Sequence, residues 1–202
     1  MKKYLLQIVS AILILASLGS ASSFQGEASA EEYAVYCAVI TNMFAGDRVT
    51  FDTQSKIKVL VIEDQTSTDL TASLDSDQDG QSFKRIFPTL AEGVVNDYRV
   101  KNKEPALLKD SFDLKLKHVL VQKQEIEKVF NDGGWWQEFY KRYPDSGGFI
   151  ILSRVGFNAG MNQALVYIQH GCGGLCGTGH YVLLEKSLDG WKVSKRSMVW
   201  IS

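Results

Sequence analysis

The sequence predicts an α+β fold, with N-terminal helices packed on a C-terminal four-stranded antiparallel meander. Apolar residues recur at helical spacing after residue 30, which indicates amphipathic helices. After residue 148, strand-like runs separated by short turns follow one another, which is typical of an antiparallel sheet. Helices followed by a block of strands favour an α+β fold, whereas regular alternation of the two would favour α/β.

The first 30 residues are expected to be an export signal with a short spacer. Two lysines follow the initiating methionine, and an apolar run extends from Leu5 to Leu18. That run is shorter than the about 20 residues of a typical membrane-spanning helix. We expect cleavage after Ser23 or after Ala30, which leaves one domain, residues 31–202, without a membrane span. The mature protein is then periplasmic or extracellular.

Local spacing predicts the elements of the first half. One apolar stripe at helical spacing begins at Tyr33, ends at Phe44 and has four members, these two included. Residues 57–62 are a β-branched run typical of a strand. The polar stretch from residue 64 to 82 is expected to be a loop. The expected helices cover residues 31–45, 89–102, 125–130 and 135–143, and a second strand covers residues 112–121.

Four strand-like runs make up the expected meander. Asp189-Gly190 separates the last two runs and predicts a two-residue hairpin turn, because a turn of that kind requires positive φ at both positions. The runs cover residues 149–157, 163–170, 180–187 and 191–201.

Charge and size restrict the classes of function. The net charge is −1, and no basic block occurs anywhere in the chain. Proteins that bind nucleic acid carry a basic patch, so no nucleic-acid partner is expected. A domain of this length buries roughly 70% of the surface of its unfolded chain, so it needs no dense set of disulfides to fold.

The most informative stretch runs from Gln169 to Tyr181. Five of the nine residues from 171 to 179 are glycine, and two cysteines lie among them. Glycine at this density permits backbone conformations that other residues avoid, and cysteines of exported proteins are usually oxidised. We therefore expect a local disulfide between Cys172 and Cys176 that holds one loop rigid.

This loop supplies most of the candidate binding residues. His170 and His180 stand at its two ends, and Gly173 and Gly174 lie between the cysteines. A loop fixed in shape at one end of a sheet favours a binding rim for a ligand or a protein partner whose identity the sequence does not indicate.

Two other interpretations of the same loop lead to an enzyme. His170, Cys172, Cys176 and His180 are the residue types of a structural zinc site, although their spacing matches no common zinc finger. Alternatively, one cysteine is a nucleophile with His170 or His180 as its base. Both require free thiols, which a disulfide would remove.

An acidic turn resembles half of a calcium-binding loop. Asp75, Asp77 and Asp79 occupy the first, third and fifth positions, and Gly80 stands at the sharp turn. The twelfth position, which should be a bidentate carboxylate, is Ile86. The pattern favours a solvated acidic turn, and neither calcium nor zinc is expected as a resident cofactor.

Six aromatic residues fall within a short stretch before the meander. Adjacent residues on a helix diverge by about 100°, so Trp135 and Trp136 are expected to differ in exposure. Both are therefore included as candidate binding residues, while packing of the aromatic stripe onto the sheet is the simpler expectation. The six are Phe130, Trp135, Trp136, Phe139, Tyr140 and Tyr143.

The C-terminal region resembles an uncharacterised family of exported bacterial proteins. The pattern consists of Ser153-Arg154-Val155-Gly156-Phe157-Asn158, Gln163-Ala164-Leu165-Val166-Tyr167, Cys172-Gly173-Gly174-Leu175-Cys176-Gly177, Tyr181-Val182-Leu183-Leu184-Glu185-Lys186 and Trp191-Lys192-Val193. The resemblance implies no activity, substrate or cofactor. The order of helices and strands is similar to that of NTF2-like and cystatin-like folds, an analogy that assigns no function. The sequence thus favours an exported, non-enzymatic binding or accessory domain, with a thiol- or zinc-dependent enzyme as the alternative.

Overall fold

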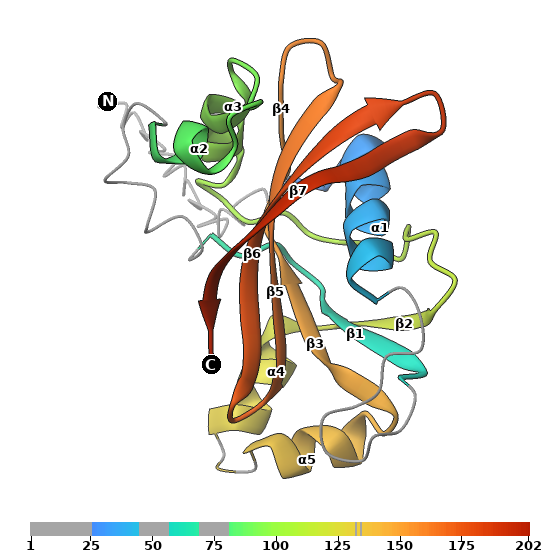
Figure 1. Cartoon of the computed structure of the whole chain (residues 1–202). Helices are drawn as coiled ribbons and strands as arrows, with labels where there is room; N and C mark the ends of the chain where they lie inside the picture. The colour runs from blue at the N-terminus through green and yellow to red at the C-terminus, as the bar shows by residue number, and fades with distance from the viewer. Residues whose placement is uncertain (1–25, 45–56, 69–80, 132, 134) are drawn as a thin grey trace, which may run out of the picture.

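The computed structural model describes residues 26–44, 57–68, 81–131, 133 and 135–202 (Figure 1). Its helices are α1 (Ala30–Phe44), α2 (Gln81–Ile86), α3 (Val94–Lys101), α4 (Lys123–Asn131) and α5 (Trp135–Arg142). Its strands are β1 (Val59–Glu63), β2 (Lys117–Val121), β3 (Ser146–Leu152), β4 (Gly156–Phe157), β5 (Gln163–Gly173), β6 (Cys176–Ser187) and β7 (Gly190–Ile201).

The strands form one seven-stranded mixed sheet in the order β2-β1-β3-β5-β6-β7, with β4 paired to β5. β1 is parallel to both β2 and β3, whereas the pairs from β3 to β7 are antiparallel. The prediction of a four-stranded antiparallel meander is therefore wrong. Strands that run parallel in one sheet require long crossover connections. The connection from β1 to β2 contains α2 and α3, and the connection from β2 to β3, which lies on the other side of β1, contains α4 and α5.

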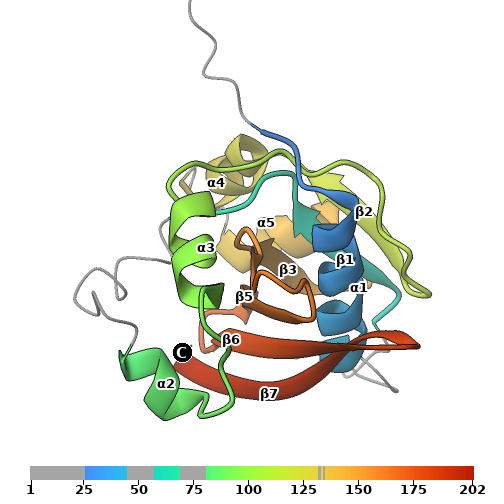
Figure 2. The ribbon, with the colours of Figure 1, turned by 90° about the horizontal axis from the view of Figure 1, so that it is seen from above.

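The helices lie on both faces of the sheet (Figures 1 and 2). α1 covers one face, where its apolar side chains pack with Val166 and Ile168 of β5. α2 and α3 pack on the opposite face against Leu165 and Tyr167, and α4 and α5 pack beside them against β1 and β2. Because alternate residues of β5 point to opposite covered faces, the strand is a continuous apolar run rather than an alternating one.

Several element boundaries correct the sequence predictions. α2 was not predicted and overlaps only the last two residues of the stretch expected to be a loop, and the expected strand 149–157 is divided into β3 and β4. The last hairpin turns at Leu188 and Asp189, because Ser187 pairs with Gly190. Gly190, with φ of 101°, is the residue in the left-handed region, so the predicted Asp-Gly turn is displaced by one position.

A pair of reciprocal hydrogen bonds sets the start of α1. The backbone N–H of Glu32 donates to Ser29 Oγ at 3.3 Å, and the backbone N–H of Ser29 donates to Glu32 Oε2 at 2.8 Å. This capping box satisfies N–H groups that the first helical turn leaves without a partner. None of the helices in the described ranges is long and apolar enough to cross a membrane.

Candidate functional site at the disulfide-closed end of the hairpin

Cys172 and Cys176 form a disulfide at the end of the β5–β6 hairpin, with Cα atoms 5.0 Å apart, as predicted. β5 extends to Gly173 and β6 begins at Cys176, so only Gly174 and Leu175 form the turn. Most of the segment expected to be a loop is therefore paired strand, almost to its tip. We call this disulfide and its turn, residues 172–176, the hairpin tip.

The glycines of this segment make room for aromatic rings. A Cβ atom on Gly171 would lie 3.3 Å from ring atoms of both Phe149 and Trp136. A Cβ atom on Gly179 would overlap the Trp200 ring and the hydroxyl of Tyr167. The glycine density thus has a packing explanation, since side chains at these positions would displace the rings.

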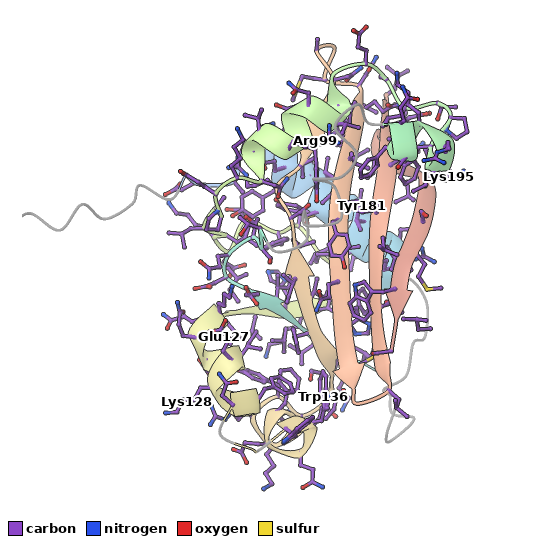
Figure 3. The ribbon with its side chains drawn as sticks, turned by 90° about the vertical axis from the view of Figure 1, so that its left-hand side faces the viewer. Arg99, Glu127, Lys128, Trp136, Tyr181 and Lys195 are labelled. Carbon is purple, nitrogen blue, oxygen red and sulfur yellow. A yellow bond between two sulfur atoms is a disulfide. The ribbon has the colours of Figure 1, made fainter. Side chains whose placement is uncertain are left out.

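Helix α5 braces the hairpin tip. The Tyr140 hydroxyl donates a hydrogen bond of 2.8 Å to the carbonyl oxygen of Cys172. Trp136 stacks on Phe149 with ring centroids 5.7 Å apart and meets Phe130 edge-on at 5.0 Å. Figure 3 shows Trp136 at the end of the sheet where the hairpin turns. The aromatic stripe therefore packs onto the sheet, which was the simpler of the two expectations.

Three large apolar side chains remain exposed on elements that meet at this end. Leu175 in the turn is 84% exposed, Trp135 at the start of α5 is 64% exposed, and Ile201 at the end of β7 is 69% exposed. The expected difference between the adjacent tryptophans is confirmed, because Trp136 lies within the aromatic cluster. Trp135 also has φ of 47°, a conformation uncommon for residues other than glycine.

The two histidines lie on the other face of the hairpin, toward α1. His170 Nε2 lies 2.6 Å from the carbonyl oxygen of Gly147, and the Phe44 ring meets the imidazole edge-on at 5.1 Å. His180 is buried, and burial lowers its pKa, with Arg196 and His170 adding to the effect. The structure therefore places the two histidines and Trp136 on opposite faces of the sheet.

The disulfide removes the thiols that both enzymatic interpretations need. In this form neither Cys172 nor Cys176 is a thiolate, so the four-ligand zinc set and the cysteine nucleophile both require reduced protein. Cys37 is a free cysteine on α1, and burial raises the pKa of its thiol. The described part of the chain holds no group of three or more His, Cys, Asp and Glu residues placed to bind a metal ion. Asp75, Asp77 and Asp79 lie outside the described residues.

A second polar region, which the sequence did not indicate, lies beyond the end of β3. Arg154 donates from Nε and Nη2 to the carboxylate of buried Glu32, at 2.7 and 3.0 Å. Beside this pair is a cavity of about 390 Å³. The sequence signal for Glu32 is the Ser-x-x-Glu pattern at residues 29–32, which marks a capping box at the start of a helix. The cavity is lined by Gly26, Val100, Lys101, Lys103, Glu104, Pro105 and Arg154.

Comparisons of the chain with family models, with curated proteins and with solved structures give no match. The resemblance to a family of exported proteins therefore stays a prediction. Any functional assignment must rest on the geometry of the hairpin tip and its surroundings.

Proposed function

We propose that this protein is an exported, non-enzymatic accessory module that binds a protein partner through its hairpin tip. The observation that carries the proposal is the exposure of Leu175, 84% of whose surface is accessible, in a turn closed by a disulfide. Gly173 and Gly174 belong to this tip. Trp135 and Ile201 are included as further contact residues because they come from elements that meet there.

Rigidity is what makes this exposed leucine suited to recognition. Binding by a flexible loop loses conformational entropy, and fixing the loop in advance reduces that cost. Here the disulfide, the pairing of Gly173 with Cys176 and the Tyr140 hydrogen bond all restrain the tip. Small molecules bind in concave pockets, so a projecting apolar side chain suits an apolar pocket on a protein partner instead.

A matched residue at the opposite end of β6 provides the control. Leu188 is fully exposed in the two-residue turn between β6 and β7, and that turn has no disulfide. We would place a photo-crosslinking amino acid at position 175 or 188, in the cells that export the protein. We expect one discrete crosslinked protein from position 175 and none from position 188. Equal products from both positions, or none from position 175, would overturn the proposal.

Substitution of both cysteines separates recognition from stability. The closed loop is so short that the disulfide contributes only about 2 kcal/mol of unfolded-state entropy. The double variant C172S/C176S should therefore remain folded, while the crosslink from position 175 weakens because the tip gains freedom. Unchanged crosslinking would show that rigidity is not required.

The enzymatic alternative makes a different prediction for the purified protein. Intact mass spectrometry, with thiol alkylation before and after reduction, counts the free cysteines directly. We expect one free thiol, at Cys37, and one oxidised pair at Cys172 and Cys176. Free thiols at positions 172 and 176, or a stoichiometric zinc mass under native conditions, would favour the enzyme instead.

A further inference from the structure

The cavity beside Arg154 lies between three segments that hydrogen bonds hold together. The N–H of Leu107 donates to Gly26 O at 3.1 Å, which joins the segment before α1 to the segment after α3. The buried side chain of Asn102 donates to the carbonyl oxygen of Arg154 at 3.1 Å and accepts from its N–H at 2.8 Å, which joins the end of α3 to the segment after β3. The walls are therefore fixed before a ligand arrives, and this lowers the entropic cost of binding.

One edge of the Arg154 guanidinium lies toward this cavity. Nε and Nη2 donate to Glu32, whereas Nη1 makes no hydrogen bond or ion pair with any residue that the structure describes. A Cβ atom built on Gly26 would lie 3.9 Å from Nη1, so this nitrogen is beside the Gly26 wall of the cavity. The arginine side chain is 16% exposed, so these N–H groups have little contact with solvent outside the cavity. Because a guanidinium holds its donors in one plane, an arginine bound to one carboxylate can bind a second carboxylate at another edge.

The charges around the cavity favour a ligand with a single negative charge. Lys103 is exposed and makes no ion pair with any described residue, so it offers one cation at the rim. The ammonium of Lys101 already lies 2.8 Å from the carboxylate of Asp97. Glu104 also lines the cavity, and Glu32 lies behind the guanidinium. Because these positive and negative charges nearly balance, a second charge on the ligand gains little attraction and still has to lose its hydration.

The rest of the lining is partly apolar. Val100, which is 55% exposed, and Pro105 contribute hydrocarbon surface to the walls. The volume of about 390 Å³ is at the small end of the range for small-molecule sites, about 300–1,000 Å³. In such sites a few polar groups orient the ligand, and apolar walls surround the remainder of it. An acid with a short hydrocarbon body matches both parts of this cavity.

We propose that this cavity binds a small monocarboxylate with a short apolar body, and that the carboxylate lies on Nη1 of Arg154. Lys103 adds attraction at the rim, and Val100 and Pro105 contact the apolar body. Free amino acids and simple carboxylic acids share this chemistry, so they are the two sources of such a ligand. The cavity lies beyond the end of β3, whereas the hairpin tip lies beside its start. The site is therefore separate from the proposed partner binding.

Three probes with the same branched hydrocarbon body test the site by NMR titration of the isotope-labelled exported protein. Leucine and isocaproate, which is leucine without its amine, carry a carboxylate, and isoamyl phosphate carries a group that is mostly doubly charged at pH 7. We expect the amide signals of Gly26, Lys103 and Arg154 to follow one saturable curve with leucine or isocaproate, and weaker binding of the phosphate. Tighter binding of leucine would assign the site to amino acids, and tighter binding of isocaproate to simple acids. No saturable shift with either carboxylate, or tighter binding of the phosphate, would overturn the proposal.

Two variants and one control test the contacts with the better of the two carboxylates. R154K keeps the positive charge but removes Nη1, so the affinity should fall by at least about tenfold, as for the loss of a hydrogen bond to a charged group. K103M should lower the affinity by about two- to fivefold, as expected for one exposed charge, and it should fold even if R154K does not. K128M is the control, because Lys128 is an exposed lysine on α4, at the opposite end of the sheet from α3 (Figure 3). Equal affinities of K103M and K128M, or the parent's affinity in R154K, would contradict the assignment.

Discussion

The hydroxyl of Tyr140 and the carbonyl oxygen of Cys172 are joined by a hydrogen bond of 2.8 Å. This bond connects α5 to the disulfide-bonded end of the sheet across 32 residues of sequence. It also places the aromatic cluster of α4 and α5 directly beside the hairpin tip, so the stability of that cluster and the position of Leu175 are linked.

The first prediction concerns this bond. The variant Y140F keeps the aromatic ring and removes only the hydroxyl, so the free energy of unfolding should fall by about 1 kcal/mol. Amide exchange at residues 172–176 should increase, because the tip loses a restraint. Denaturant unfolding and hydrogen exchange measure the two effects.

Y143F is the control for this prediction. Tyr143 also donates a hydrogen bond, at 2.8 Å, but to the exposed carboxylate of Glu125. Equal exchange at the tip in both variants would contradict the bracing role.

The second prediction concerns the glycine-rich strands. G179A should destabilise the protein by about 1–3 kcal/mol, because the added methyl group overlaps Trp200 and Tyr167. G174A should be nearly neutral, since a Cβ atom there meets nothing within 4 Å. Thermal unfolding of the two variants makes the comparison. If G174A were the more destabilised of the two, the packing explanation of the glycines would be wrong.

The third prediction concerns acid stability. Burial raises the pKa of Glu32, but hydrogen bonds from Arg154 and from backbone N–H groups outweigh it, so the net pKa is below its ordinary value of 4.5. A carboxyl with a lowered pKa in the folded state stabilises the protein above about pH 4.5, and this stabilisation is lost as the pH falls through the folded-state pKa. Unfolding free energies measured from pH 7 down to pH 3 should therefore decline.

The variant E32Q isolates this contribution. It leaves Arg154 without its charged partner, so it should lose about 3 kcal/mol at pH 7. It should also show a weaker decline in acid than the parent, because the titrating group is gone. An unchanged pH dependence would mean that other carboxyl groups cause the acid sensitivity.

The fourth prediction distinguishes the two expected cleavage positions. The segment before α1 is built into the fold: the N–H of Leu107 donates to Gly26 O at 3.1 Å, and Lys109 pairs with Glu27 at 2.6 Å. Cleavage after Ala30 would remove these contacts and the Ser29 cap, which alone is worth about 1 kcal/mol. The mature chain should therefore begin at Phe24, as intact mass will show. A mass that corresponds to a start at Glu31 would contradict this.

Much of the local structure could be predicted from the sequence. Helix α1 was expected from its apolar stripe, and the Cys172–Cys176 disulfide was expected because cysteines of exported proteins are usually oxidised and this pair lies in a glycine-rich segment. Both depend on neighbours in sequence. A difference in exposure between Trp135 and Trp136 was also predictable, because adjacent residues on a helix point about 100° apart, although the sequence did not indicate which of the two is exposed.

The arrangement of the sheet was not predictable in this way. β1 and β2 were expected as strands, but their parallel pairing beside β3 joins segments that are far apart in the chain. Periodicity reports which residues are apolar and not which strand is the neighbour. The same limit applies to the Glu32–Arg154 pair, whose partners are 122 residues apart.

The sequence alone therefore determined most of the helices and strands, the disulfide and the candidate region, because each is encoded by residues close together in the chain. Only the tertiary structure decided that the glycines accommodate Trp136 and Trp200, and that His170 and His180 face α1 rather than the aromatic cluster. Those outcomes depend on strand register and on which face each helix covers, and both are set by contacts between distant segments.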